Sequence, residues 1–259
     1  MNFQKFSHSE LEKLIRKYDA MPDIYYTDTV PVGPGQLGNR SWMHRLGYQP
    51  GDTTQLWEWM AGSASLSAAA RTDDMTHLPP IDHRWGYHVG ATDDQEKLIY
   101  VQLIFGTDVL FAAPTCTPWG GHARGWDKDN RTRQRDAQQS TLQFLAVACV
   151  IQMCLGRFFV IENPHASDIW SESVLRRLRT DSHLTVLDQC QFGAKLEGEF
   201  ILKATDLLSN VCLPGLAKGC DGSHRHLVLR GTNKQGSRTA QSAVYPSTLC
   251  SAMLNDFVG

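Results

Sequence analysis

From Leu56 onward, short apolar runs alternate with segments of helical spacing, and this alternation limits the fold more than any other feature of the chain. The runs at 109–113 and 158–162 are almost wholly apolar, as expected for strands that are buried on both faces of a sheet. Strands that alternate with helices predict βαβ units and a parallel sheet. The sequence therefore predicts an α/β fold in which a mostly parallel sheet carries helices on both faces.

The same alternation gives an order to the predicted strands. The runs at 56–60 and 78–82 are the first and second strands, 109–113 is the fourth and 158–162 is the fifth. A third strand is expected between the second and the fourth. Ligands of open parallel sheets bind outside the carboxyl ends of the strands, so the residues that follow each run are the candidates for function.

The 259 residues are enough for one large domain, or for one domain with a small satellite. The capping-box pattern Ser7-x-x-Glu10 predicts a helix near the start of the chain. After Asp188 the alternation weakens, and Gly, Lys, Cys and His become frequent. The expected parts are an N-terminal helix and irregular arm (1–54), the sheet region (55–188), a small irregular C-terminal region (189–242) and a closing helix (243–259).

Composition excludes several classes of protein. A hydrophobic content of 42% is enough for a core, which argues against disorder. The net charge of −2 excludes a strongly cationic nucleic-acid coat but is compatible with a local basic patch. Seven irregularly spaced cysteines favour reduced thiols. No run approaches the roughly 20 apolar residues of a membrane span, so we expect a soluble, intracellular protein with no membrane partner, in nucleus or cytoplasm. No protein partner is indicated.

A turn rich in small residues follows the first predicted strand. Residues 58–67 read Glu-Trp-Met-Ala-Gly-Ser-Ala-Ser-Leu-Ser, and small residues at the start of a helix let an anionic ligand approach the backbone. Asp82 ends the second predicted strand, 24 residues after Glu58. This interval suits a carboxylate that accepts hydrogen bonds from ribose hydroxyls. Together the two features predict a cofactor that contains a nucleoside.

The fourth and fifth predicted strands end in residues of catalytic type. Cys116 lies between Pro114 and Pro118, which hold the loop stiff and present the thiol. Glu162 and Asn163 end the fifth strand, where the carboxylate is expected to face Cys116 across a cleft. Two simpler interpretations stay open, in which Cys116 is a buried small hydrophobe and Glu162-Asn163 only forms a turn or cap.

In this order, these segments resemble the cytosine-C5 DNA methyltransferase family, S-adenosylmethionine enzymes on a Rossmann-like sheet. Residues 56–67 resemble the family's cofactor loop, and Asp82 resembles its ribose acid. Pro114-Thr115-Cys116 is similar to the Pro-Cys nucleophile loop, and Glu162-Asn163 to the Glu-Asn motif. Ala243-Val244-Tyr245-Pro246 and the final helix resemble the segment that closes onto the catalytic domain. The resemblance covers 56–193 best.

The resemblance implies methylation of cytosine C5 in DNA through a covalent Cys116 adduct, with Glu162 and Asn163 as further catalytic residues. The target cytosine would have to be flipped out of the duplex or lie in a single strand, and 189–242 would be a reduced target-recognition region. The residues that the resemblance implies for S-adenosylmethionine binding are Glu58, Trp59, Met60, Ala61, Gly62, Ser63, Ser65, Asp82 and Pro114.

The sequence also departs from the family's pattern. The Gly-Gly pair of the cofactor loop is Ala64-Ser65, and His88, with Asp93 or Asp94 nearby, is the candidate for the acid expected after the third strand. The Gln-x-Arg-x-Arg motif has no clean match; its region contains only Lys195 and Lys203. Three alternatives therefore stay open: a methyltransferase acting on RNA or nucleotides, a catalytically decayed nucleic-acid-binding protein on this fold, and a cysteine hydrolase.

A basic segment at 122–136 follows the Cys116 loop directly. Its cations and Trp126 suit phosphate contacts and base stacking beside a nucleophile. The alternative is a solvated start of a helix, because acidic residues are interspersed. The candidate nucleic-acid-binding residues are Arg124, Lys128, Arg131, Arg133 and Arg135.

Four soft side chains near the C-terminus indicate a zinc site. Cys212, Cys220, His224 and His226 fall within 15 residues, and zinc is commonly held by four Cys and His ligands. The spacing is not a standard one, and Cys190 is an alternative for one of the four. The other interpretation is a reduced thiol with surface histidines around a Gly-rich turn.

Overall fold

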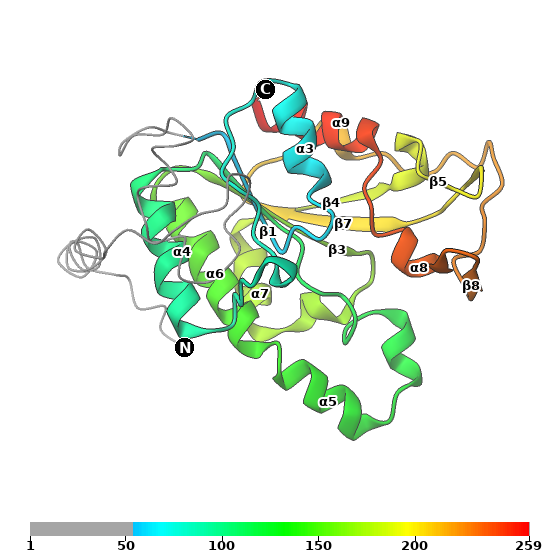
Figure 1. The fold of residues 1–259 in the computed structure, drawn as a ribbon, viewed down its shortest axis with the longest axis horizontal. Helices are drawn as coiled ribbons and strands as arrows, with labels where there is room; N and C mark the ends of the chain where they lie inside the picture. The colour runs from blue at the N-terminus through cyan, green and yellow to red at the C-terminus, as the bar shows by residue number, and fades with distance from the viewer. Residues whose placement is uncertain (1–53, 259) are drawn as a thin grey trace.

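The computed structural model describes residues 54–258, so the N-terminal helix and arm expected at 1–54 lie outside the described residues apart from Thr54. A five-stranded sheet forms the centre of the fold, with the strand order β1-β2-β3-β7-β4 (Figure 1). Its strands are β1 (Leu56–Trp59), β2 (Val109–Ala112), β3 (Phe158–Pro164), β4 (His183–Asp188) and β7 (Ala204–Ser209).

The sheet is mixed rather than simply parallel. β1, β2 and β3 pair in parallel, whereas β7 is antiparallel to both β3 and β4. The segment between β4 and β7 contains only a short 3-10 helix (Gln189–Phe192) and the ribbon β5 (Lys195–Leu196) and β6 (Glu199–Phe200). A parallel neighbour needs a crossover that is usually helical, so this connection returns the chain antiparallel.

The predicted third strand is wrong. The described residues between Asp82 and Val109 form a 3-10 turn (His83–Trp85) and the helix α4 (Thr92–Ile104). The apolar run near residue 100 belongs to α4, whose first turn carries Asp93 and Asp94, as favoured at a helix N-terminus. The second predicted strand is an edge segment that joins β1 through the parallel bridges Leu56–His77 and Trp59–Ile81.

The path of the chain reverses between β1 and β2. After β1 the chain runs to the edge segment on one side, and then returns through α4 to β2 on the other side of β1. The carboxyl ends of β1 and β2 are therefore a topological switch point, where open α/β sheets bind their ligands.

Helices cover both faces of the sheet (Figure 1). Along β2, Leu110 and Ala112 face the core shared with α4, α6 (Gln139–Cys154) and α7 (Ser173–Leu178). Val109 and Phe111 face the opposite core, which contains residues of α3 (Ser65–Thr72) and α9 (Ser247–Val258). None of the helices within 54–258 is both long and apolar enough to cross a membrane.

The remaining elements are short. α5 (Lys128–Asp136) extends away from the sheet, at the bottom of Figure 1, and has no buried residue. The ribbon β8 (Thr232–Asn233) and β9 (Gly236–Ser237) and the helix α8 (Arg238–Gln241) precede α9. The other 3-10 helices are Gly121–Gly125, Asp168–Ser171, Arg179–Asp181 and Pro214–Leu216.

Candidate active site

The β1–α3 turn (residues 60–64) leaves the sheet at the switch point in a strained path. Met60, Gly62 and Ala64 have positive φ values of 52°, 55° and 53°. Such values are unusual for residues with a side chain and concentrate at ligand-binding sites. A methyl group placed at Gly62 would meet no described atom within 4 Å, so the space beside the turn is open. Ala64 follows the left-handed path that a glycine would take more easily.

Asp82, at the end of the edge segment, fastens the β1–α3 turn to that segment. Its Oδ2 accepts a hydrogen bond from the Gly62 amide at 2.8 Å, and its Oδ1 accepts one from the Arg84 amide at 3.0 Å. The carboxylate is 3% exposed, and the Arg84 guanidinium donates in turn to the Gly62 carbonyl at 3.0 Å. Asp82 and the turn are therefore one hydrogen-bonded unit.

The side chains of Glu58 and Trp59 contact other parts of the protein and hold the fold together. The Ser67 amide and hydroxyl donate to Glu58 Oε2 at 2.7 and 2.6 Å, which joins β1 to α3. Burial raises the pKa of Glu58 to about 7. Trp59 is fully buried and stacks on Phe144 of α6, 5.7 Å between ring centroids, so it belongs to the core on the other face of the sheet.

The other residues of the predicted cofactor set divide between core and solvent. Ala61 is buried, and Met60 packs against the core that contains α6. The Ser63 and Ser65 hydroxyls are 2.8 Å apart and point into a partly exposed region. His88, with Asp94 nearby, is the candidate for the acid expected after the third predicted strand. In the structure, the His88 amide donates to the buried Asp94 carboxylate at 2.8 Å.

The Cys116 loop is held to the end of β3 by the predicted Glu-Asn pair. Asn163 is fully buried, and its Nδ2 donates to the Pro114 carbonyl at 2.9 Å. Within the loop, the amides of Trp119 and Gly120 donate to the Cys116 carbonyl at 3.0 and 2.8 Å. The loop is thus a tight turn with a fixed place above the sheet, which leaves Cys116 partly exposed.

Glu162 and Cys116 lie close enough for the Glu162 charge to act on the thiol. Burial, and then the Glu162 charge, raise the pKa of the Cys116 thiol, while the Lys203 charge lowers it. Burial also raises the pKa of Glu162, against the opposing effects of Lys203 and of a hydrogen bond from Tyr245. We call Cys116, Glu162, Lys203 and Tyr245 the Cys116 site.

Lys203 and Tyr245 were not predicted as site residues. Lys203 directly precedes β7, and its Nζ donates to the Ser242 carbonyl at 3.1 Å and lies 5.6 Å from the Tyr245 ring centroid. Only the insertion of β7 beside β3 brings Lys203 near Cys116, and no local pattern signals that insertion. Tyr245 stands in the Tyr-Pro pair before α9, which the sequence marks as a boundary but not as a polar site.

Two arginines of the basic segment at 122–136 contact other segments of the chain. Arg135 donates to the Pro118 carbonyl at 3.0 Å and to Asp168 at 2.6 Å, so it anchors α5 to the Cys116 loop. Arg124 lies 3.9 Å from Asp168. The remaining predicted phosphate contacts are on α5 itself, where Arg133 donates to Asn130 at 3.1 Å and Lys128 and Arg131 complete the set.

The predicted zinc ligands are regrouped. Cys220, His224 and His226 lie together, but their fourth neighbour is Cys190. Cys212 is exposed, and its sulfur lies 3.5 Å from Nδ1 of His183 on β4. The inclusion of Cys212 is therefore wrong, because the loop after β7 directs it toward β4.

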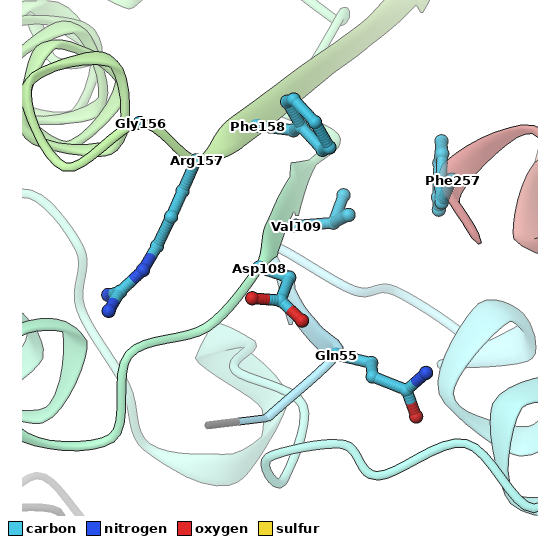
Figure 2. Close-up of a pocket in the computed structure, with 7 residues that line it drawn as sticks. All are labelled: Gln55, Asp108, Val109, Gly156, Arg157, Phe158 and Phe257. Atoms are coloured by element: carbon cyan, nitrogen blue, oxygen red, sulfur yellow. The ribbon is translucent and has the colours of Figure 1, made fainter. Parts of the chain in front are cut away.

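A separate pocket lies at the opposite edge of the sheet (Figure 2). It is formed where β1, β2 and β3 begin, together with Phe257 of α9. Open α/β sheets bind ligands at the carboxyl ends of the strands and not at these amino ends, so the pocket is not the candidate active site. Its lining residues are Gln55, Asp108, Val109, Gly156, Arg157, Phe158 and Phe257.

Comparisons with known proteins leave the function to be inferred from the site itself. No protein-family model matches the chain, and no match was found among curated proteins. Sheet topology and the chemistry of the Cys116 site are therefore the basis for assigning a function.

The two charges beside Cys116 predict opposite changes in its reactivity. In an alkylation assay at about pH 9, Glu162→Gln removes the charge that raises the Cys116 pKa, so it should lower that pKa and speed alkylation, whereas Lys203→Met should slow it. A drop of one pKa unit raises the fraction of thiolate but also makes the thiolate less nucleophilic. These opposing effects leave a change of about threefold in the alkylation rate. Iodoacetamide labelling followed by peptide mass spectrometry measures each cysteine separately, with the exposed Cys154 as internal control. Equal rates in both variants would contradict this electrostatic account.

Glu58 predicts a pH dependence of folding stability. Its pKa rises from 4.5 to about 7 on folding, so between these pH values the folded state holds a proton that the unfolded state has lost. The stabilising effect is complete below pH 4.5 and is lost as pH rises to about 7. Relative to Glu58→Gln, the wild-type free energy of unfolding should fall by about 2–4 kcal/mol over this range. Urea denaturation of both proteins measures the difference, and parallel pH curves would contradict it.

Proposed function

We propose that the protein is an S-adenosylmethionine-dependent methyltransferase that methylates cytosine C5 in DNA, with Cys116 as nucleophile. One observation carries the proposal. An open, strained turn, a cysteine loop and a buried glutamate meet at the carboxyl ends of β1, β2 and β3. This is the end of an open α/β sheet where ligands bind. This combination supports a two-substrate reaction in which a thiol attacks one substrate beside a bound cofactor.

The β1–α3 turn and Asp82 fit a nucleoside cofactor. The space beside Gly62 is open to a ligand, while the Ser67 amide in the first turn of α3 already donates to Glu58. Asp82 Oδ1 accepts the Arg84 amide and also lies 3.1 Å from His83 Nδ1 and 3.7 Å from Arg84 Nε. Oδ2 accepts the Gly62 amide, and because a carboxylate oxygen can accept more than one hydrogen bond, acceptor capacity for a ribose hydroxyl remains on Oδ2. When bound, S-adenosylmethionine supplies a methyl group on a sulfonium sulfur, which leaves as a neutral thioether.

Cys116 divides the difficult step into two easier ones. Its thiol first loses a proton to solvent, and the sulfur then bonds to C6 of the cytosine while the C5–C6 double-bond electrons move to C5. C5 takes the methyl group. Loss of the C5 proton to water then restores the double bond and breaks the sulfur–C6 bond, which frees Cys116.

In this proposal, Glu162 hydrogen-bonds the N3 side of the same ring. Because its pKa is raised, the carboxyl group is favoured in the protonated form that donates a hydrogen bond and stabilises charge on the ring. Glu162 Oε1 has no hydrogen-bond partner within the described part of the chain, so it is free to accept or donate to a substrate. Lys203 supplies the cation beside Cys116 that a Gln-x-Arg-x-Arg motif does not provide here.

Asn163 acts as a positioning residue, because its amide holds the backbone of the Cys116 loop against the end of β3. α5 follows the loop and is anchored to it by Arg135, so Lys128 and Arg131 are placed to contact the phosphates that flank a flipped base.

The three alternatives make different demands on the structure. A decayed fold that only binds nucleic acid has no need for the open space at Gly62 or for charges beside Cys116. A cysteine hydrolase needs a general base next to the thiol, yet no histidine with a described side chain contributes to the Cys116 pKa. His165 pairs instead with Asp206 at 2.7 Å. RNA as the substrate is compatible with the same site.

Cys116→Ala should abolish methyl transfer while leaving cofactor affinity unchanged, because the thiol touches the pyrimidine and not the turn. The assay uses labelled S-adenosylmethionine with mixed DNA and RNA, and locates the label. Cys154→Ala, which alters an exposed cysteine at the end of α6, is the matched control and should keep full activity. Calorimetry of the purified variants measures cofactor binding.

Three outcomes would overturn parts of this assignment. Methyl transfer by Cys116→Ala would contradict the covalent mechanism. Label recovered only in RNA would select the RNA alternative. Failure of the wild type to bind S-adenosylmethionine, with DNA binding intact, would select the decayed protein.

A further inference from the structure

Four side chains from separate segments converge beyond the end of β4. Cys190 lies in the 3-10 helix Gln189–Phe192, and Cys220, His224 and His226 lie in the loop that precedes β8. Their ligand atoms all lie within 4.8 Å of one another. We call these four residues the Cys/His cluster.

Two distances inside the cluster are close to the edges of a tetrahedral zinc site. The Cys220 sulfur lies 3.5 Å from Nε2 of His226 and 3.8 Å from Nε2 of His224. Zinc bonds of about 2.3 Å to sulfur and 2.0–2.1 Å to nitrogen give a tetrahedral sulfur–nitrogen edge of about 3.5 Å. Both imidazoles thus direct Nε2 toward one sulfur, an arrangement compatible with a metal ion shared by the three side chains.

The surroundings hold the ligands in this orientation. The Gly222 amide donates to the Cys220 sulfur at 3.4 Å and so helps to fix the position of that sulfur. The Ser223 hydroxyl lies 3.3 Å from Nδ1 of His224, and a partner on the second ring nitrogen fixes which nitrogen binds metal. Asp188 Oδ2 accepts from the Cys220 amide at 2.7 Å, which fastens the loop to the end of β4.

We propose that Cys190, Cys220, His224 and His226 bind one zinc ion in a closed tetrahedral site. Two thiolates and two imidazoles are a typical zinc ligand set, and four protein ligands leave no open position for catalysis. A disulfide between Cys190 and Cys220 is the competing arrangement. It would leave unexplained why two imidazole nitrogens approach the Cys220 sulfur.

The ion takes the place of a hydrophobic core in residues 217–241, none of which is buried. Their regular structure is limited to the two-residue strands β8 and β9 and the short helix α8. Zinc joins the loop around residue 220 to the end of β4, while the Leu227 amide donates to the Phe200 carbonyl of β6 at 2.7 Å. A structural metal commonly stabilises segments that are too small for a core of their own.

The test uses the full chain purified under reducing conditions from zinc-containing medium. We expect about one zinc per chain, and X-ray absorption with about two sulfur ligands at 2.3 Å and two nitrogen ligands near 2.0 Å. Cys212→Ser is the matched control, because Cys212 lies outside the cluster, and it should keep the metal. Cys190→Ser should lose most of it. Cobalt(II) in place of zinc should give the intense visible bands of a tetrahedral thiolate site.

Several results would overturn the zinc proposal. Wild-type protein with less than about 0.1 zinc per chain and no tetrahedral cobalt spectrum has no such site. Loss of zinc from Cys212→Ser, or an X-ray absorption spectrum without sulfur, would refute the ligand set. A disulfide between Cys190 and Cys220 in the reduced preparation would support the competing arrangement. If Cys190→Ser does not fold, the wild-type spectrum still decides, and none of these measurements depends on methyl transfer.

Discussion

The in-register parallel pairing of β1, β2 and β3 is the constraint on which the candidate site depends. Trp59 pairs with Ala112, and Ala112 pairs with Ile161, so β1 and β2 end at one level and Glu162 is the first residue of β3 beyond it. The next residues along each strand begin the turn at Gly62, lead into the Cys116 loop and include Glu162. Three segments that are far apart in the sequence therefore meet at one edge, and the hydrogen bond from Asn163 to Pro114 holds two of them together.

Buried charge gives this edge its chemistry. Glu58 and Glu162 both lie on the side of the sheet that α9 covers, and both acids influence the pKa of Tyr245. Burial favours protons on Glu58, Glu162 and Cys116, and Lys203 opposes this effect at the last two. Burial and the Glu162 charge both disfavour the Cys116 thiolate, so a reaction that begins with this thiolate depends on the opposing charge of Lys203.

The features that could be predicted from the sequence are those that residues adjacent in the chain determine. The apolar runs of β2 and β3, the turn after β1 and the order of Cys116 and Glu162 follow from residues that are adjacent in the chain. The antiparallel insertion of β7 depends on contacts with distant strands, so Lys203 could not be assigned. The apolar stretch of α4 has no strand-specific signal, which explains the false third strand. Cys190 rather than Cys212 joins the histidines because the chain folds back from β4, a contact that spacing alone does not reveal.

The most direct test of the account is to trap the protein on DNA that contains 5-fluorocytosine, in the presence of S-adenosylmethionine. Fluorine at C5 blocks the final proton loss, so the account predicts a stable protein–DNA adduct, with the modified peptide mapping to Cys116. An adduct mapped to another cysteine, or methylated product without any adduct, would contradict it.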